Sequence, residues 1–201
     1  MKTRPLYLDC LIELEKEIIS KLNRGYLDKK SAFNLFVLST LSENNVNSRI
    51  VVLRNFCSVR WEILIHSDLR SKKISELQLN KKVCLNFWDP KTNFQIRVRG
   101  EAEKDKLNIE KVWDKLSNWS KRNYLSKKTP GKFTKKGISG FDENFLNNPP
   151  DQKHSSEGKK NFCQIKIFIK SMDCLILNRL GYRRALFQNK SNKMYGKWLI
   201  P

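Results

Sequence analysis

The stretch of sequence that decides the fold is residues 49–103, which read RIVVLRNFCSVRWEILIHSDLRSKKISELQLNKKVCLNFWDPKTNFQIRVRGEAE. Apolar residues alternate over most of it, as in half-buried strands, whereas residues 69–77 have the spacing of a helix. We therefore expect a strand, a second strand, a helix, a strand, a turn and a strand. Side chains that bind phosphate are dense here, namely Arg49, Ser67, Arg70, Ser71, Lys72 and Lys73.

The predicted helix of this stretch suits a bound anion. Ser67 or Asp68 is the expected N-cap, which puts Lys72 and Lys73 in the first turn or two. Free backbone N–H groups, the helix dipole and two ammonium groups would then act together on a phosphate. The last strand of the stretch adds Gln95, a side-chain amide that can both donate and accept hydrogen bonds.

The flanking segments predict a mainly β protein with flanking helices. Apolar spacing predicts a helix over about 6–23, ended by Gly25, and another over 107–119. Residues 120–160 are basic and rich in Gly and Pro, and predict loops with one short helix. Strands are expected at 33–41, 49–56, 61–66, 82–88, 94–100, 162–169, 172–177, 182–188 and 195–200. This hairpin-rich series favours a closed or split β-barrel, which we expect to form one domain over residues 1–201.

Composition narrows the class of protein. The chain has 201 residues and a formal net charge of +20, a surplus that would attract any polyanion. Zinc, helix-turn-helix and RNA-recognition signatures are missing, so we read the charge as spread over solvated faces, except for a concentrated run at 121–136. Five cysteines without metal-binding spacing favour reduced thiols in a cytoplasmic protein and no metal site.

Five motifs in order carry a resemblance. They are RIVVLR at 49–54, HSDLRSKK at 66–73, QIRVRGEAE at 95–103, YRRALF at 182–187 and WLIP at 198–201. Together they resemble the pyridoxamine 5′-phosphate oxidase-related family of FMN-binding split barrels. The wording of the second motif is similar to the subgroup known from cyanobacteria and plants rather than to the vitamin B6 enzyme itself.

The resemblance implies a homodimer with two FMN sites at the subunit interface. Arg49, Lys72 and Lys73 would hold the phosphate, with Ser67 nearby, and the backbone of Val51 and Val52 would line the flavin ring. Gln95 and Arg184 would reach the flavin from the partner subunit, Arg184 as a cation near the N1/C2 carbonyl edge. The full set expected to bind the cofactor is Arg49, Ile50, Val51, Val52, His66, Ser67, Ser71, Lys72, Lys73, Gln95 and Arg184.

The substrate side of the resemblance is incomplete. Arg54 stands where the B6 enzyme has a lysine, and Tyr182 where it has a substrate-contacting side chain, so these two are the expected substrate-binding residues. The later phosphate-gripping set is missing from residues 119–124, which leaves B6 oxidase activity open. A flavin-dependent oxidoreductase acting on a small substrate is therefore favoured, with no catalytic side chain assigned. The alternatives are a binding module for nucleic acid or another polyanion and, more weakly, a haem-binding relative.

Overall fold

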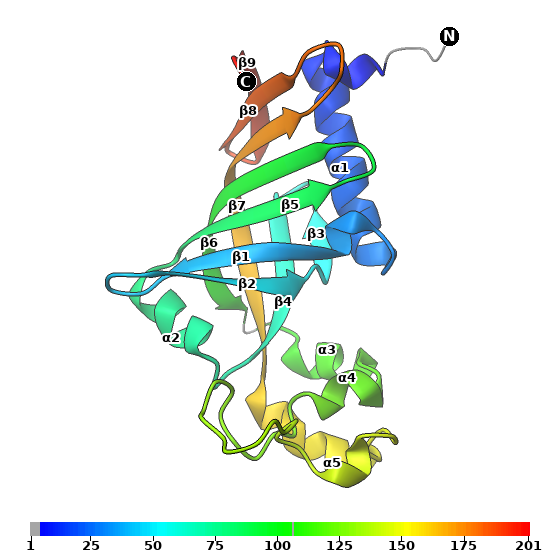
Figure 1. Ribbon diagram of the computed structural model, residues 1–201, viewed down its shortest axis with the longest axis vertical. Helices are drawn as coiled ribbons and strands as arrows, with labels where there is room; N and C mark the ends of the chain where they lie inside the picture. The colour runs from blue at the N-terminus through cyan, green and yellow to red at the C-terminus, as the bar shows by residue number, and fades with distance from the viewer. Residues whose placement is uncertain (1–4, 106) are drawn as a thin grey trace.

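The computed structural model of the protein describes residues 5–105 and 107–201, and in this range nine strands form one antiparallel sheet (Figure 1). Along the main path the strand order is β2-β1-β5-β6-β7-β4-β3, and β8 extends from β7 to pair with β9. The predicted mainly β architecture with flanking helices is confirmed. The strands are β1 (Leu35–Leu41), β2 (Val46–Val52), β3 (Asn55–Cys57), β4 (Glu62–Asp68), β5 (Lys82–Asp89), β6 (Phe94–Asp105), β7 (Phe162–Ile176), β8 (Arg183–Lys190) and β9 (Lys193–Leu199).

Three of the predicted strands were wrong in their boundaries. The strand expected at 49–56 is interrupted at Leu53 and Arg54, whose backbone N–H groups bond to carbonyls of other segments, so β2 and β3 are separate. The strands expected at 162–169 and 172–177 are one continuous strand, β7. Because β7 changes partner from β4 to β8 along its length, the polar residues near its middle do not end it.

Strands β6 and β7 form the longest pairing in the fold, and a register shift between Arg99 and Gly100 interrupts it. A Cβ atom placed on Gly100 would lie 2.5 Å from the carbonyl oxygen of Phe168. Glycine therefore lets the two backbones approach closely at the bulge, where the long pair bends.

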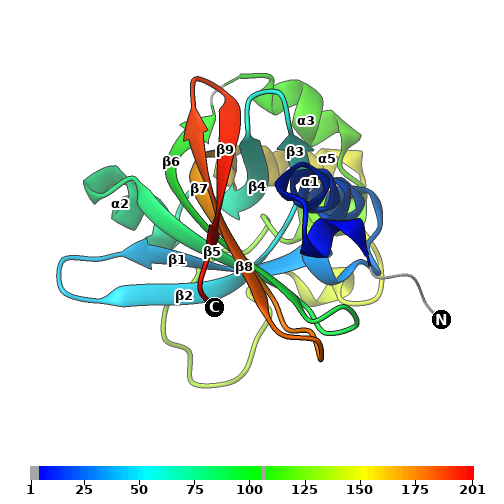
Figure 2. The ribbon, with the colours of Figure 1, turned by 90° about the horizontal axis from the view of Figure 1, so that it is seen from above.

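Helices α1 (Leu11–Leu27) and α2 (Lys72–Leu79) lie on opposite sides of the barrel (Figure 2). Helix α1 begins later than expected and continues past Gly25, so the prediction that this glycine ends the helix was wrong. Gly25 is instead buried, and a Cβ atom there would meet Leu53 and Phe33 at 2.9 Å. The helix uses glycine for close packing on the barrel.

The core lies between α1 and the inner face of the sheet. Leu14, Ile18 and Leu22 of α1 are fully buried at helical spacing. They join an aromatic layer in which the ring of Phe87 lies 4.4 Å from that of Phe36 and 5.2 Å from that of Phe33, measured between centroids. Stacked and tilted rings at these distances add to the hydrophobic stabilisation of the core.

A lobe of short helices lies below the barrel, made by residues 107–161 (Figure 1). The helix expected at 107–119 is broken at Leu116 into α3 (Ile109–Lys115) and α4 (Asn118–Arg122). Residues 120–160 are largely loops, as predicted, but they hold two 3₁₀ turns, Glu143–Phe145 and Gly158–Asn161, besides α5 (Gln152–Glu157). No helix among the described residues is long and apolar enough to cross a membrane.

An aromatic cluster joins this lobe to the barrel. Phe162, at the start of β7, contacts the rings of Trp113, Tyr124 and His66 at centroid distances of 5.3, 5.1 and 5.0 Å. Burial in this cluster, reinforced by the charge of Arg54, lowers the pKa of His66 to about 4. His66 is therefore neutral at neutral pH and packs as an aromatic residue.

The bulge predicts a backbone-specific stability effect. Gly100→Ala should lower the free energy of unfolding by about 1–3 kcal/mol, because the added methyl group would overlap a carbonyl oxygen of the paired strand. Gly137→Ala is the matched control, since no atom lies within 4 Å of the corresponding Cβ position. Urea unfolding of both variants measures the difference, and equal stabilities would contradict the packing assigned to Gly100.

The lowered pKa of His66 predicts loss of stability in acid. Between about pH 7.5 and pH 5 the unfolded chain takes up a proton at this histidine while the folded protein does not, which should cost about 2 kcal/mol. His66→Gln should lose correspondingly less stability over the same interval, whatever its stability at neutral pH. Denaturant titrations at both pH values give the change in the free energy of unfolding with pH for the wild type and for the variant. Equal changes in the two proteins would show that His66 titrates normally in the folded protein.

Candidate functional site

The end of β4 and the start of α2 bring three of the expected phosphate-binding side chains together. Lys73 donates hydrogen bonds to the hydroxyl oxygens of Ser67 and Ser71, each at 3.0 Å, and these hydroxyls are 3.1 Å apart. Both serines are buried, and Ser67 pairs in the sheet with Cys163, whose thiol donates to the Ser67 carbonyl at 3.4 Å. The ammonium group is thus held in one place by neutral partners that do not cancel its charge.

Arg49 joins this cluster from β2. Its side chain lies on the inner face of the sheet and contacts the carboxylate of Glu76 at 3.0 Å and the hydroxyl of Thr40. Burial, followed by the nearby charge of Arg49, lowers the pKa of Lys73. Two cations are therefore close enough to disfavour each other, and an anion between them would relieve that repulsion.

Helix α2 begins at a different residue from the one expected. Ser71 is its N-cap, so the assignment of Ser67 or Asp68 to that position was wrong. Asp68 instead accepts hydrogen bonds from the backbone and guanidinium of Arg70, which turns the chain into the helix. Lys72 is the first helical residue and is exposed, whereas Lys73 is half-buried against the serines, so the structure separates two lysines that the sequence treats alike.

The remaining residues of β2 divide between the two faces of the sheet. Val51 is half-buried and packs against the core, while Ile50 points to the opposite face and is exposed. Val52 is half-buried at the end of the strand, opposite Leu35. Chain continuity places Arg49, Ile50, Val51 and Val52 together, but only Arg49 has a side chain in the cluster described above.

Arg54 and His66 lie between the cluster around Lys73 and the lobe of helices. The charge of Arg54 contributes to lowering the pKa of His66 and acts on Tyr124 as well, although burial dominates there and raises the pKa of that phenol. Arg54 itself is exposed. Of the two expected substrate-binding residues, Arg54 and Tyr182, it is therefore Arg54 that lies on the same side of the fold as Lys73.

Gln95, Arg184 and Tyr182 lie at the other end of the molecule. Leu175 of β7 pairs with both Gln95 of β6 and Arg184 of β8, so these two polar side chains share a row on one face of the sheet. Gln95 donates to the side chain of Asn86 at 2.9 Å. Tyr182 and Arg184 line a pocket of about 240 Å³ with Leu8, Asp9, Arg183, Trp198 and Leu199.

The cluster around Lys73 and the row of Gln95 and Arg184 are too far apart to bind one ligand within one chain. Cys163, which pairs with Ser67, and Leu175, which pairs with Gln95, lie near opposite ends of β7. At ~3.3 Å per residue the strand between them has a contour length of roughly 40 Å, and the bend at the bulge shortens the direct distance. A single flavin nucleotide does not span that distance, so a site containing both groups requires two copies of the chain.

Two acidic residues at these sites were missed by the sequence analysis. Glu76 is 2% exposed and bonds to Arg49, Thr40 and Asn47. Asp173 makes two hydrogen bonds to Arg184, at 3.0 and 2.8 Å, and one to Arg97 at 2.6 Å. A signal for Glu76 was present, because it follows Lys73 by one helical turn and so shares its face of α2. Asp173 is brought to Arg184 only by the pairing of β7 with β8.

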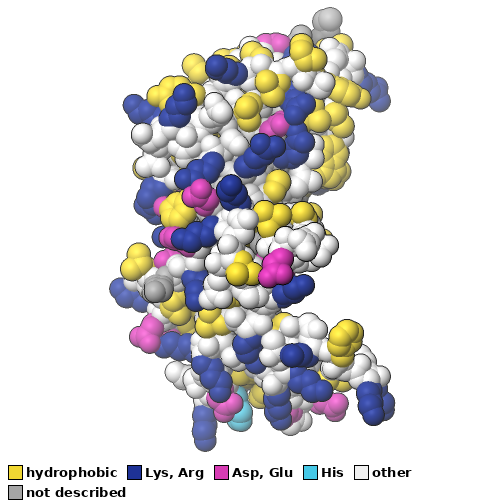
Figure 3. All heavy atoms as spheres, turned by 90° about the vertical axis from the view of Figure 1, so that its left-hand side faces the viewer, with side chains coloured by type: hydrophobic (Ala, Val, Ile, Leu, Met, Phe, Trp, Pro, Cys, Tyr) yellow, Lys and Arg dark blue, Asp and Glu magenta, His cyan; other side chains and the backbone are white. Residues whose placement is uncertain are grey.

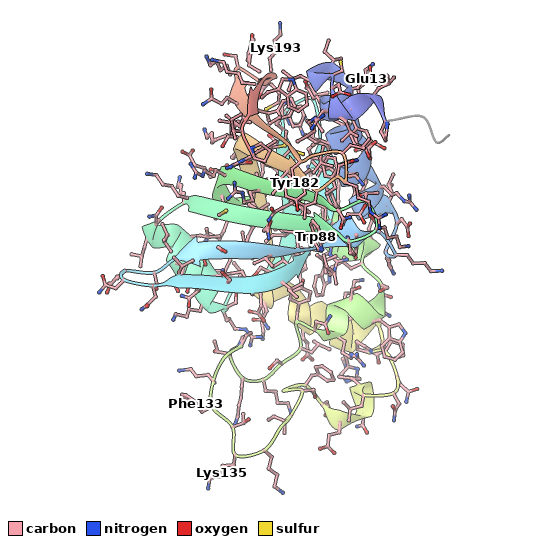
Figure 4. The ribbon with its side chains drawn as sticks, turned by 45° about the horizontal axis from the view of Figure 1, so that its top comes forward. Glu13, Trp88, Phe133, Lys135, Tyr182 and Lys193 are labelled. Carbon is pink, nitrogen blue, oxygen red and sulfur yellow. The ribbon has the colours of Figure 1, made fainter. Side chains whose placement is uncertain are left out.

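The basic run at 121–136 begins beside the phosphate-type cluster and then leaves it. Arg70 donates to the carbonyl of Ser126 at 2.8 Å, which attaches the start of the loop to the turn before α2. Arg122 is a structural cation, since its guanidinium lies 4.7 Å from the ring of Trp119 and 4.9 Å from that of Phe141. Figure 4 shows Phe133 and Lys135 at the far end of the loop, away from the barrel.

Chemically, the cluster at α2 could hold a phosphate monoester. It offers an ammonium group, which two serine hydroxyls hold in place, and a guanidinium, and these two cations can bind a dianion by charge-assisted hydrogen bonds. The row formed by Gln95 and Arg184 offers an amide and a guanidinium, which suit the carbonyl and N–H edge of a flavin. The residues present therefore fit the two ends of FMN.

Comparisons of the sequence with known proteins agree with this chemistry. Residues 14–104 match the sequence model described as pyridoxamine 5′-phosphate oxidase, FMN-binding domain. A pyridoxine/pyridoxamine 5′-phosphate oxidase of Leptospira interrogans is 28% identical over 81 residues, and one of Legionella pneumophila is 32% identical over 79 residues. These matches cover 40% and 39% of this chain but only 37% and 36% of the two relatives.

Solved structures resemble the whole fold. A pyridoxamine 5′-phosphate oxidase-related, FMN-binding protein from Nostoc punctiforme has a TM-score of 0.71 at 22% identity, covering 92% of this chain and 96% of that one. PhzG from Burkholderia lata, solved with tetrahydrophenazine-1-carboxylic acid, has a TM-score of 0.67 at 15% identity, covering 99% and 98%. At these identities the likeness shows the fold, which is the predicted split barrel.

The resemblance drawn from the motifs is thereby confirmed over residues 14–104, and FMN is the cofactor for which the matching domain is named. Residues 14–104 are thus similar to a pyridoxamine 5′-phosphate oxidase FMN-binding domain, and the chain has the split-barrel fold of such proteins.

Proposed function

We propose that this protein is a flavoprotein that holds the phosphate of FMN with Lys73, Ser67, Ser71 and Arg49. The observation that carries the proposal is the ammonium group of Lys73, fixed 3.0 Å from two buried hydroxyls and near a second cation. No carboxylate bonds to Lys73 among the described residues, so its charge is directed to a ligand. Lys72 and the backbone of residues 50–52 would complete the near side of the site, and His66 would form an apolar wall.

We further propose that two copies of the chain build each site. Gln95 of β6 and Arg184 of β8 pair with the end of β7 that is far from Ser67. They would therefore contact the FMN of the partner subunit rather than that of their own. One face of the sheet supports this arrangement, because it exposes the large apolar side chains Leu35, Leu41, Val46, Ile50 and Trp88. Contiguous exposed apolar surface of this kind is typical of protein interfaces.

The proposed activity is oxidoreduction of a small anionic substrate. FMN, when bound, supplies two-electron transfer chemistry, and the protein supplies binding and charge. Arg54 would attract the anion on the near side, and Tyr182 would contact the substrate from the partner. The attachment of the basic loop to Arg70 supports an anionic substrate, since the positive run starts next to the cofactor phosphate. The B6 vitamers themselves remain only one candidate.

A polyanion-binding role is the second candidate function. It is supported by the loop at 127–136, which carries five lysines without an acidic residue, and by the fully exposed ring of Phe133. Against it, Lys and Arg side chains are scattered over the face seen in Figure 3 rather than gathered in one stripe.

We place the protein in the cytoplasm because all five cysteines are free thiols. We also propose that the chain acts as one domain.

The cofactor proposal predicts a coloured protein with a charge-dependent affinity. Purified protein mixed with FMN should retain absorbance bands near ~450 and ~375 nm through gel filtration. The double variant Arg49→Ala/Lys73→Ala should weaken FMN binding by roughly 3 kcal/mol or more, the scale of two lost charge-assisted bonds. Fluorescence titration measures the affinity, and Lys193→Ala, an exposed lysine at the β8–β9 turn, is the control. An unchanged affinity in the double variant would remove the phosphate assignment.

The two-copy proposal predicts that FMN and dimer are lost together. Ile50→Glu puts a charge at a position that is 69% exposed on the apolar face, and should give a monomer that releases FMN. Val59→Glu is the matched control, since Val59 is 76% exposed but lies in the β3–β4 turn. Light scattering after gel filtration gives the mass of each variant. A wild-type monomer that keeps FMN would overturn the shared site.

A further inference from the structure

Glu76 is a buried carboxylate that neither the motifs nor the proposed function uses. It is 2% exposed, on the face of α2 that also carries Lys73. One carboxylate oxygen accepts from Thr40 at 2.5 Å and from Arg49 at 3.0 Å, and the other accepts from Asn47 at 2.7 Å. Helix α2 is thereby tied to both strands of the β1–β2 hairpin at the place where Arg49 leaves β2.

The contacts of Glu76 keep it charged in spite of its burial. Burial alone would raise its pKa, but the hydrogen bond from Thr40 and the charge and hydrogen bond of Arg49 outweigh this effect and lower the pKa. A charged carboxylate with both oxygens engaged is a fixed anchor rather than a ligand group. It has no donor to offer to a phosphate.

Arg49 depends on this anchor for its position. Its guanidinium has five N–H donors, and the bonds to Glu76, to Thr40 and, at 3.5 Å, to the carbonyl of Leu38 use only part of them. The remaining N–H groups of the Arg49 guanidinium have no protein partner among the described residues. Without Glu76, repulsion from Lys73 would push this long side chain, which is 23% exposed, out toward water.

We infer that Glu76 is the positioning residue of the phosphate site: it holds the Arg49 guanidinium beside the Lys73 ammonium so that both meet one phosphate. This inference rests on the proposed function, since it concerns the same site. It assigns Glu76 an effect on recognition of the phosphate group alone. A purely structural role would instead alter the binding of any flavin equally.

The test compares FMN with riboflavin, which lacks the phosphate. Dissociation constants for both flavins are measured by fluorescence quenching in the wild type and in Glu76→Ala, Glu76→Gln and Glu62→Ala. Glu62 is the matched control, a buried carboxylate paired with Arg60 at the opposite end of β4 from Ser67. The readout is the ratio of the riboflavin constant to the FMN constant, which isolates the contribution of the phosphate.

Glu76→Ala should lower this ratio at least about tenfold, the effect of losing one well-placed charge-assisted bond. Glu76→Gln should restore most of it, because its amide oxygen can still accept from Arg49, and Glu62→Ala should leave it unchanged. If Glu76→Ala fails to fold, Glu76→Asp serves in its place, since it keeps the charge but withdraws the oxygens from Arg49.

Two results would overturn the inference. A ratio unaltered by Glu76→Ala or Glu76→Asp would reduce Glu76 to a structural residue. A ratio raised by both Glu76→Ala and Glu76→Gln would show that its charge opposes the phosphate. Failure of the proposed function is separate, because the wild type itself would then show no preference for FMN over riboflavin, or Arg49→Ala would leave that preference intact.

Discussion

The antiparallel pairing of β6 with β7 is the constraint on which the rest of the structure depends. It runs the length of both strands and bends at the bulge beside Gly100, where the two backbones meet with no room for a side chain. One end of β7 pairs with β4 and so carries the turn into α2, while the other end pairs with β8. Because a strand is a rigid spacer, this pairing sets the distance between the phosphate-type cluster and the row of Gln95 and Arg184.

That distance supports the site shared by two copies that we propose. A ligand with a phosphate at one end and a polar ring at the other matches both groups chemically, yet a single chain holds them at opposite ends of one strand. The exposed apolar face of the sheet offers the second copy a surface on which to bind. In the shared site that we propose, the barrel would present two half-sites, each built on strands or at a helix start, where side chains are held firmly.

Each of the two proposed half-sites also pairs a cation with a carboxylate that the cofactor would not need to touch. Glu76 holds Arg49, and Asp173 holds Arg184 by two hydrogen bonds while also accepting one from Arg97. In both cases the pKa of the acid is lowered although burial opposes this, so the carboxylates stay ionised and fix the guanidinium groups. Arginine suits this role because its planar fork can serve an acid on one side and a ligand on the other.

The sequence by itself determined most of the strand and helix pattern, the resemblance to FMN-binding split barrels and the presence of a phosphate-type cluster, because alternation, turn residues and the spacing from Ser67 to Lys73 are local properties. Only the tertiary structure decided that Gly25 lies inside α1, that β7 is one strand, and that Lys72 is exposed while Lys73 is not. It alone brought Glu76 to Arg49 and Asp173 to Arg184, since contacts between distant segments depend on strand register and helix packing, which no short stretch of sequence contains.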